Sequence, residues 1–379
     1  MSGRRGPAQH VVVVGGWAPS LLKFRGPLLA ALRARGHRVT AMAADGTAEV
    51  RAGLAALGVD FEDLALERAG TSATTDLATV VALTRRLRVL SPDVFLGYTA
   101  KPVIYGGVAA RLARVPRRYA LVTGLGYAFL GQDAWRRRAL RRVVATMYRA
   151  SLSGCDRVFL QNADDLAELH SAGALPARTA TTIVRGSGVD VDHYAPAPWP
   201  DGPPVFLFVG RLLREKGIAE FVAMARAVRA RHPEARFRAV GWRDPNPASV
   251  GAAELAAWTD EGVLEYAGEL ADVRPALAAA HVLVLPSYRE GTPRSVLEAM
   301  SMARPVITTD VPGCRDTIVD GEHGYLVPAR DPAALAAAAE RLLADPARAQ
   351  AMGQAARARI LALYDARAVA AAMLEGMEL

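Results

Sequence analysis

The residues best suited to ionic chemistry gather in two loops of the second half of the chain. One loop follows the apolar run 205–209 and carries Arg211 and Lys216. The other follows the apolar run 282–285 and carries Glu290, with Glu298 eight residues further on. Two cations at one strand end and a helix start at another are suited to clamp a diphosphate. Two glutamates at this spacing are alone a weak signal, because most charged side chains are simply solvated.

The elements around these residues predict how they are held. The run 282–285 indicates a buried parallel strand, and the residues Pro286 and Ser287 end it. A helix then begins near Pro293, since proline suits a first turn. Glu290 therefore lies at the carboxyl end of a strand, the edge where open α/β sheets bind ligands. The backbone N–H groups around that helix start predict an anion site made by Gly291, Thr292, Pro293 and Arg294.

The rest of the chain alternates in the same way, which is typical of doubly wound parallel sheets. The expected strands of the first half are 10–14, 37–42, 59–62, 93–97, 118–122, 157–160 and 180–184, separated by helices such as 21–35, 75–89 and 103–113. Residues 196–204 are rich in proline and predict a linker between a domain 1–195 and a domain 205–362.

Composition excludes several classes of protein. At 379 residues, two domains of ordinary size are expected. No apolar run reaches the roughly 18 residues needed to span a bilayer, and the first residues show no apolar signal region. The two cysteines, Cys155 and Cys314, argue against a disulfide framework, and no metal-ligand spacing is evident. We therefore expect a cytoplasmic enzyme without a metal.

Charge is unevenly distributed along the chain. Residues 1–195 carry 26 Lys and Arg against 15 Asp and Glu, whereas the remainder carries 20 against 23. The first half therefore predicts an anionic partner, such as a membrane surface or a lipid diphosphate. Nucleic acid is not expected, because the arginines lack the interleaved aromatics of a single-strand binder. The only three lysines, Lys23, Lys101 and Lys216, all fall in or near loops that follow expected strands.

Three motifs together resemble the retaining glycosyltransferases of family 4. They are Gly210-Arg211 with Lys216-Gly217, then Pro286-Ser287 with Glu290-Gly291 and Glu298-Ala299, then Gly313, Asp316, Ile318, Asp320-Gly321 and Gly324. The resemblance implies a GT-B fold, in which two Rossmann-like domains face an interdomain cleft. It also implies that the final helix, residues 363–379, crosses back to the first domain. The first domain would then bind the acceptor and the second the nucleotide sugar.

The resemblance also implies roles for these residues. Arg211 and Lys216 would stabilise the departing diphosphate together with the amides of the 291–294 helix start. Glu298 would accept hydrogen bonds from the ribose, and Glu290 would hold the transferred sugar. Gly16, in the loop after the first strand, and Gly210 would let the backbone approach the donor. Without the resemblance, Gly15-Gly16 would indicate only a tight turn.

Two loops of the first half are expected to meet the acceptor. Tyr98 and Lys101 follow one strand, and Thr123 and Gly124 follow another. Many members of the resembled family carry a histidine in each loop, whereas this chain has none. The segments instead resemble the branch that extends lipid-diphosphate-linked sugars. Lys101, and Lys23 on the same edge, would meet the acceptor phosphate; a simple solvated cation is the alternative for Lys101.

Residues 134–152 predict an amphipathic helix with two stripes. Leu140, Val143, Val144 and Met147 form the apolar stripe, and Arg137, Arg138, Arg141 and Arg142 form the basic one, preceded by Trp135. Such a helix suits an anionic membrane surface, although solvated arginines are the plain alternative.

These observations predict a retaining glycosyltransferase at the inner face of the cell membrane. It would move a hexose or N-acetylhexosamine from a nucleotide sugar, which we expect to be UDP-linked, to an undecaprenyl-diphosphate-linked saccharide in exopolysaccharide, capsule or O-antigen synthesis. The alternatives are a transferase with a soluble acceptor, a UDP-sugar 2-epimerase of the same fold, and a regulator that binds a nucleotide sugar without turnover.

Overall fold

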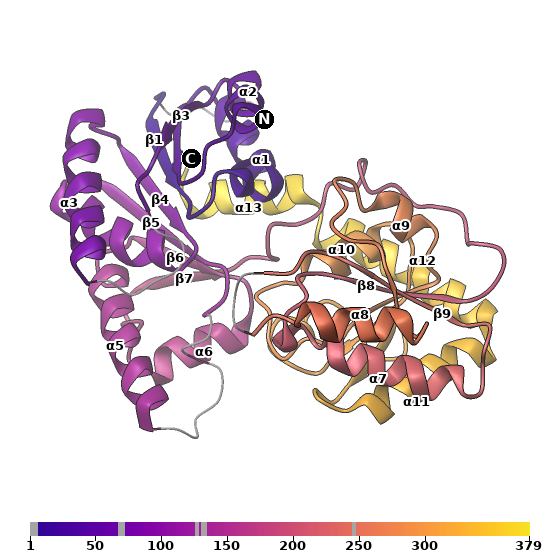
Figure 1. The fold of residues 1–379 in the computed structure, drawn as a ribbon. Coiled ribbons are helices and arrows are strands. Elements are labelled where there is room, and N and C mark those ends of the chain that lie inside the picture. Colours follow the sequence, from indigo (N-terminus) through magenta and orange to yellow (C-terminus); the bar gives the residue numbers. More distant parts are fainter. Residues whose placement is uncertain (1–6, 67–72, 126–128, 130–134, 245–247) are drawn as a thin grey trace. The chain divides into compact units, whose positions relative to one another are not determined.

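A computed structural model describes residues 7–66, 73–125, 129, 135–244 and 248–379. Two parallel sheets organise them, each in a unit of its own (Figure 1). The first unit comprises residues 1–187 and 366–379, and the second comprises residues 188–365. The prediction of two doubly wound parallel sheets is confirmed.

The first sheet has seven parallel strands in the order β3-β2-β1-β4-β5-β6-β7. Apolar residues on both faces of its central strands explain why helices cover it on both sides. Its strands are β1 (His10–Val14), β2 (Arg38–Ala43), β3 (Asp60–Asp63), β4 (Val94–Tyr98), β5 (Arg117–Val122), β6 (Arg157–Leu160) and β7 (Ala180–Ile183).

Helices cover the two faces of this sheet in two groups. One face packs against α1 (Pro19–Ala34), α2 (Ala48–Ala56) and the final helix α13 (Ala366–Gly376). The other face packs against α3 (Ala73–Leu90), the π-helical turn η1 (Pro102–Gly106), α4 (Gly107–Leu112), α5 (Trp135–Leu152) and α6 (Ala163–Ser171). The alternation along β1 produces this division, because Val11 and Val13 point to one core and Val12 and Val14 to the other.

The final helix belongs to the first unit. Ala370, Met373 and Leu374 of α13 are buried in the same core as Leu28 and Leu32 of α1. The Tyr119 hydroxyl of β5 also donates to the carbonyl of Met377 over 2.9 Å. The last residues of the chain therefore complete the cover of the first sheet.

The second sheet has six parallel strands in the order β10-β9-β8-β11-β12-β13. The strands are β8 (Val205–Val209), β9 (Arg236–Val240), β10 (Glu265–Tyr266), β11 (Val282–Leu285), β12 (Val306–Thr309) and β13 (Gly324–Val327). The helices are η3 (Arg214–Lys216), α7 (Ile218–Arg229), α8 (Ala252–Asp260), α9 (Arg274–Ala278), α10 (Arg294–Ser301), α11 (Pro332–Ala344) and α12 (Pro346–Leu363).

Residues 188–204, which include the proline-rich segment, pack with the second unit. The buried guanidinium of Arg304 donates to the carbonyls of Ala197 and Pro198 over 3.2 and 2.6 Å. It also donates to the carbonyls of Leu277 and Ala278 over 3.1 and 2.8 Å. Four carbonyl partners compensate for burying this charge, and they attach the segment to the end of α9.

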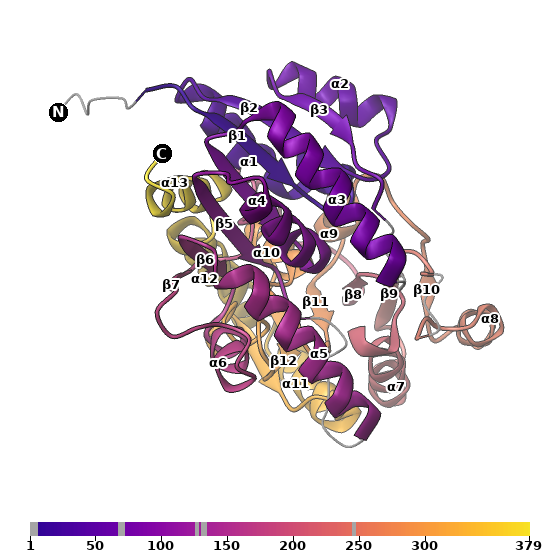
Figure 2. The same cartoon turned by 90° about the vertical axis from the view of Figure 1, so that its left-hand side faces the viewer.

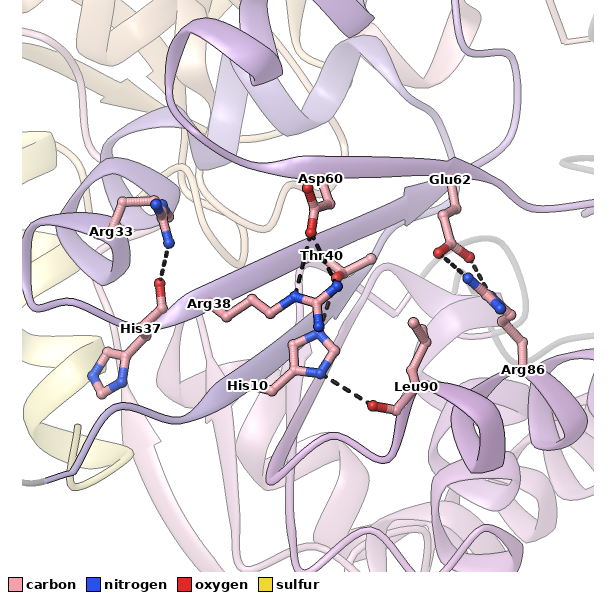
Figure 3. A network of polar contacts seen from close by, with 9 residues as sticks. All are labelled: His10, Arg33, His37, Arg38, Thr40, Asp60, Glu62, Arg86 and Leu90. Carbon is pink, nitrogen blue, oxygen red and sulfur yellow. Dashed lines mark hydrogen bonds and ion pairs between the residues drawn. The ribbon is translucent and has the colours of Figure 1, made fainter.

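A polar network ties the first three strands to α3 (Figure 3). His10 of β1 contacts the Thr40 hydroxyl of β2 at 2.9 Å and the Leu90 carbonyl of α3 at 3.2 Å. The Arg86 guanidinium of α3 donates from both Nε and a terminal nitrogen to the carboxylate of Glu62 on β3. These contacts join neighbouring strands to one another and to α3, which is a structural role.

Candidate functional site

Each sheet reverses its strand order at one place, and most of the residues predicted to bind ligands follow the strands at that place. In the second sheet the reversal lies between β8 and β11. The loop after β8 carries Gly210, Arg211 and Lys216, and the loop after β11 carries Ser287 and Glu290. The carboxyl edge at such a reversal is where open α/β sheets form a ligand crevice.

Lys216 and Glu290 meet directly at this edge. The Lys216 ammonium forms an ion pair with Oε1 of Glu290, and the Ser287 hydroxyl donates to the same oxygen over 2.7 Å. Ser287 is fully buried, and its own carbonyl accepts from the Thr309 hydroxyl of β12. The carboxylate of Glu290 is therefore held by a cation and a fixed hydroxyl.

Two glycines allow these loops to approach each other. Gly217 has φ +77°, and a Cβ there would lie 2.1 Å from the Pro286 carbonyl oxygen. Gly313 has φ +79°, and a Cβ there would lie 2.3 Å from the Glu290 carbonyl oxygen. Only glycine fits either position without displacing backbone. The loops after β8 and β11 and the 313 turn thus enclose Glu290 by backbone contact.

Arg211 has a partner that was not predicted from the sequence. Its guanidinium lies 3.1 Å from Oδ2 of Asp244, a residue of the loop after β9. Arg211 and Lys216, the two cations of the predicted diphosphate clamp, therefore each have a carboxylate partner in the structure. Asp244 follows a strand at the same edge, and that position was the signal available in the sequence.

Helix α10 begins at Arg294, one residue after the predicted start. Its N-cap, Pro293, provides no side-chain cap, and the preceding residues Gly291 and Thr292 are half-buried. Uncapped N–H groups at a helix start favour an anion. The predicted position of the anion site thus coincides with a suitable local backbone.

Glu298 lies on the first turns of this helix and is buried. Its Oε1 accepts from Nε of Arg294 over 2.6 Å. Burial, together with the carboxylate of Glu298, raises the pKa of Tyr194. Tyr194 therefore lies against Glu298 as a neutral phenol, and it is a site neighbour that sequence reasoning did not identify.

The thiol nearest to Glu290 is unsuited to nucleophilic chemistry. Cys314 follows Gly313 and is fully buried. Burial raises the pKa of its thiol to about 12, and the carboxylate of Glu290 acts in the same direction. A thiol that remains protonated at neutral pH is a poor nucleophile.

In the first unit, the strand order reverses between β1 and β4. Gly16 follows β1 and is half-buried; a Cβ there would lie 3.0 Å from the Thr99 hydroxyl. Thr99 follows β4 and has φ +67°, an unfavourable backbone conformation for a β-branched residue. Strain of this kind is often found at functional sites, and Thr99 is the β-branched residue among the seven described non-glycine residues with positive φ.

Tyr98 does not face this edge, so its predicted contact with an acceptor is corrected. Its side chain is buried, its hydroxyl lies 2.7 Å from the Ser20 hydroxyl, and its ring lies 4.9 Å from the Arg25 guanidinium. Burial raises its pKa to about 12. A Cβ on Gly15 would collide with the Tyr98 ring, so the tyrosine packs directly beneath the loop and supports it.

The other residues predicted to meet the acceptor have varied surroundings. Lys101 precedes η1 and lies 3.2 Å from Asp76, which also accepts from the Tyr105 hydroxyl over 2.7 Å. Lys23 is exposed, with its ammonium 5.9 Å from the Trp17 ring. Thr123 and Gly124 follow β5 and are half-buried, and Gly124 has φ +132°.

The predicted basic helix is present as α5, but its arginines do not share one environment. Arg138 and Arg142 are exposed. Arg141 is half-buried, since it pairs with Glu168 of α6 over 2.5 Å and lies 5.8 Å from the Phe129 ring. Its expected contact with a membrane is corrected, because its charge is compensated within the unit. The side chains of Trp135 and Arg137 lie outside the described residues.

Two kinds of feature are absent from the residues that the structure describes. No group of three or more His, Cys, Asp or Glu side chains in that part of the chain is arranged to hold a metal ion. Among the same residues, no helix combines the length and the hydropathy needed to cross a bilayer.

Comparisons with known proteins agree across both units. A family model described as glycosyl transferases group 1 matches residues 203–345. A model described as a glycosyl transferase 4-like domain matches residues 26–186. The first match includes the loops after β8 and β11, and the second includes the loops after β4 and β5.

Individual relatives differ in what their names specify. N,N'-diacetylbacillosaminyl-diphospho-undecaprenol alpha-1,3-N-acetylgalactosaminyltransferase of Campylobacter jejuni is 26% identical over 318 residues, covering 80% of this chain and 81% of the relative. The 2-deoxystreptamine N-acetyl-D-glucosaminyltransferase of Streptomyces fradiae is 38% identical over 178 residues, covering 46% of this chain and 42% of the relative.

A solved structure shares the whole fold. HepE of Anabaena, in complex with UDP and glucose, has a TM-score of 0.78 and covers 98% of this chain and 99% of its own. Its sequence identity is 16%, so the likeness concerns the fold.

Proposed function

Because the chain belongs to the glycosyltransferases of the GT-B fold, with a 4-like domain followed by a group 1 domain, we propose that it is a retaining transferase using a nucleotide sugar. The donor is a UDP-sugar, and the transferred group is a hexose or an N-acetylhexosamine. The acceptor is a saccharide linked to undecaprenyl diphosphate, extended for exopolysaccharide, capsule or O-antigen.

The observation that carries this proposal is the cluster of Lys216, Ser287 and Glu290 at the strand reversal of the second sheet. It combines a cation for a leaving diphosphate with a carboxylate for a sugar. The start of α10 lies on the loop that follows the same strand, β11. Charge arranged in advance of the reaction is usually the largest catalytic contribution, and one such contact is worth about 3 kcal/mol.

Donor binding exchanges the partners of the two cations. The β-phosphate of the donor takes Lys216 from Glu290, and the other phosphate oxygens take Arg211 from Asp244. The carboxylate of Glu290, still held by Ser287, then accepts hydrogen bonds from the sugar. Glu298 accepts hydrogen bonds from the ribose, and Gly16 and Gly210 leave room for the donor.

Transfer proceeds on the front face of the sugar. The bond from the anomeric carbon to the diphosphate oxygen breaks, and the acceptor oxygen bonds to the same face. The acceptor proton passes to the departing phosphate, so UDP leaves as the second product. Cys314 takes no part as a nucleophile, because it is buried and protonated. The cations and the helix start stabilise the diphosphate without a metal, so no cofactor is proposed.

The proposed acceptor determines where in the cell the enzyme acts. A lipid diphosphate holds the reaction at the inner face of the cell membrane, and the C. jejuni relative is named for a substrate of that class. Thr123 and Gly124 bind the acceptor saccharide. Lys101 and Lys23 meet its phosphates once Asp76 releases Lys101. Arg138 and Arg142 of α5 contribute to the approach to the membrane.

A soluble acceptor is the second candidate. It is favoured by the S. fradiae relative, whose name specifies 2-deoxystreptamine rather than a lipid. The two candidates share the donor site and differ only in what the first unit binds.

The test is a panel of UDP-, GDP- and ADP-sugars with the full-length protein, following nucleotide release with and without undecaprenyl-diphosphate-linked sugars. We expect release from a UDP-sugar that accelerates with the lipid-linked acceptor, and a product with the anomeric configuration of the donor. Acceleration only by soluble saccharides would support the second candidate. Interconversion of UDP-sugars without any acceptor would contradict both, because it would indicate an epimerase.

A further inference from the structure

Three of the helices that cover one face of the first unit carry almost only basic charge. The helices α3, α4 and α5 contain ten arginines and a single acidic residue, Asp76. Asp76 is already paired with Lys101. Six of the arginines are exposed: Arg85, Arg88, Arg111, Arg138, Arg142 and Arg149. Over three neighbouring helices, the positive charge is therefore essentially uncompensated by carboxylates on the same helices.

The same three helices expose most of the large apolar side chains that reach solvent. Within the described residues, ten large hydrophobic side chains are exposed, and six of them lie on α3, α4 and α5. They are Leu77, Val81, Val89, Leu112, Leu140 and Val143. Val89 is 72% exposed, Leu77 64% and Val143 58%. Such a concentration is unusual on the surface of a soluble domain and marks an interaction surface.

These helices form one continuous layer. Figure 2 shows α3, α4 and α5 side by side on one face of the first unit, and α4 contacts both of its neighbours. Their inner sides are occupied by the core, through Leu83 and Leu87 of α3 and Tyr148 of α5. Their exposed side chains therefore point away from the sheet. The helices of the opposite face, α1, α2 and α13, contribute none of the ten exposed apolar side chains.

A hollow of about 1000 Å³ borders this layer between α5 and the loop after α6. Its lining includes Arg149, His170 and Arg178, together with the hydroxyl residues Thr146 and Ser153, and it contains no carboxylate. The hollow is open to solvent and large enough for a phosphate-bearing headgroup. The basic character of the layer thus continues into a concave site.

We propose that α3, α4 and α5 together form a docking surface for an anionic phospholipid bilayer. The exposed apolar side chains enter the boundary between headgroups and acyl chains, and the arginines pair with lipid phosphates. The surface is wider than α5 alone and is centred on residues that have no part in the donor site. The proposal rests on the function proposed above and deepens it, since a lipid-linked acceptor is anchored in the same kind of bilayer that this surface would bind.

The test is sedimentation of the full-length protein with vesicles of phosphatidylcholine alone or mixed with phosphatidylglycerol. The wild type is expected to bind the anionic vesicles, weakly at high salt, and not the neutral ones. Removing two charges with Arg85→Gln and Arg88→Gln should weaken binding roughly 25-fold, at about fivefold for each charge. Leu77→Gln with Val81→Gln should weaken binding to a similar degree.

Matched controls come from α12 of the second unit. Leu361 is 52% exposed and Arg348 is exposed, so Leu361→Gln and Arg348→Gln make the same chemical changes elsewhere. These variants are expected to bind vesicles like the wild type. Equal binding by the α3 variants, or no binding of the wild type to anionic vesicles, would overturn the proposal. Loss of a protein partner by the α3 variants, with vesicle binding unchanged, would also overturn it.

A second readout separates this proposal from the proposed function. Nucleotide release from a soluble donor in the absence of lipid is expected to be the same in the α3 variants and the wild type. Vesicle binding without any transferase activity would leave the docking surface standing and contradict the proposed function. Transfer activity without vesicle binding would do the reverse.

Discussion

At the scale of single residues, the second unit fixes the orientation of the Glu290 carboxylate through two hydrogen bonds. Glu290 accepts hydrogen bonds from Lys216 and from Ser287, and binding of a nucleotide sugar affects these two partners differently. The diphosphate of the nucleotide sugar competes with Glu290 for the ammonium of Lys216, but it does not compete for the buried hydroxyl of Ser287. Ser287 therefore keeps Glu290 oriented when Lys216 turns to the phosphate, and we regard it as a positioning residue.

Removing that hydroxyl should slow the reaction more than it weakens donor binding. Ser287→Ala is expected to lower kcat roughly tenfold or more, because a hydrogen bond to a charged group is worth about 1.5–3 kcal/mol. The KM for the donor should change little. Ser301→Ala removes another fully buried serine hydroxyl of this unit and serves as the control for folding. A kcat for Ser287→Ala equal to that of the wild type would argue against the role.

The carboxylate itself should be indispensable. Glu290→Ala is expected to lower kcat at least 100-fold, since it removes the group that supports positive charge at the anomeric carbon. Its folding should be intact by circular dichroism, because the side chain lies on a loop. Transfer at the wild-type rate in this variant would refute the assigned role.

Motif positions could be predicted from the sequence at this scale, but their partners could not. Arg211, Lys216, Glu290 and Glu298 follow strands or open a helix, and strand ends can be located from apolar runs. Their pairing depends on loops distant in sequence, as with Arg211 and Asp244. Tyr98 was expected to meet the acceptor because it follows a strand in a loop where many members of the resembled family carry a histidine. Its ring instead packs against Gly15, in space that a side chain at that position would occupy. The sequence contains no local signal for that choice.

At the scale of elements, the donor site depends on how closely its loops approach. Gly217 ends η3 and opens α7, and its Cα hydrogen faces the Pro286 carbonyl. Gly217 thus has both a positive φ and a close backbone contact, and each of these favours glycine at this position. The loops after β8 and β11 are therefore locked together one residue away from Lys216.

Gly217→Ala should destabilise the second unit by roughly 3 kcal/mol or more, because the alanine pays for the left-handed backbone and for a collision with backbone atoms. Gly262→Ala is a matched control, since Gly262 has φ +71° and a Cβ there would meet open space. It should cost only about 1–2 kcal/mol. Urea unfolding measures both, and equal losses would show that the loop contact is unimportant.

Element boundaries were predictable where the apolar pattern is simple. Helix α10 and strand β11 lie within a residue or two of their expected positions. The helix expected at 103–113 is instead a π-helical turn followed by α4. Ser151 of α5 donates to the Val103 carbonyl in this turn, and Gly107 leaves room for the Ser151 side chain. A tertiary contact of this kind is not visible in the local sequence.

At the scale of the whole molecule, buried histidines link stability to pH in both units. Nδ1 of His37, His281 and His323 accepts a backbone N–H, over 3.3, 3.1 and 3.0 Å respectively. Burial lowers the pKa of each histidine from its ordinary value of 6.5, and a neighbouring arginine acts in the same direction. The folded state therefore resists protonation that the unfolded state accepts.

The direction in which stability changes with pH follows from this difference in proton binding between the folded and unfolded states. Below pH 6.5 the unfolded chain binds more protons than the folded one, so stability falls as the pH falls. We expect a lower urea midpoint at a pH of about 5.5 than at about 7.5. His281→Gln, which keeps a hydrogen-bond acceptor but does not titrate, should make the urea midpoint less dependent on pH. A midpoint independent of pH in the wild type would contradict this account.

The central claim is that Lys216 binds the diphosphate of a nucleotide sugar, and its most direct test is donor turnover by Lys216→Gln beside Arg214→Gln. Arg214 lies in the same 3-10 turn and pairs with Glu254 at the surface, so the two variants lose the same charge two residues apart. We predict that Lys216→Gln lowers kcat/KM for the UDP-sugar at least 100-fold, while Arg214→Gln stays within a few-fold of the wild type. Equal activity of the two variants would contradict the claim.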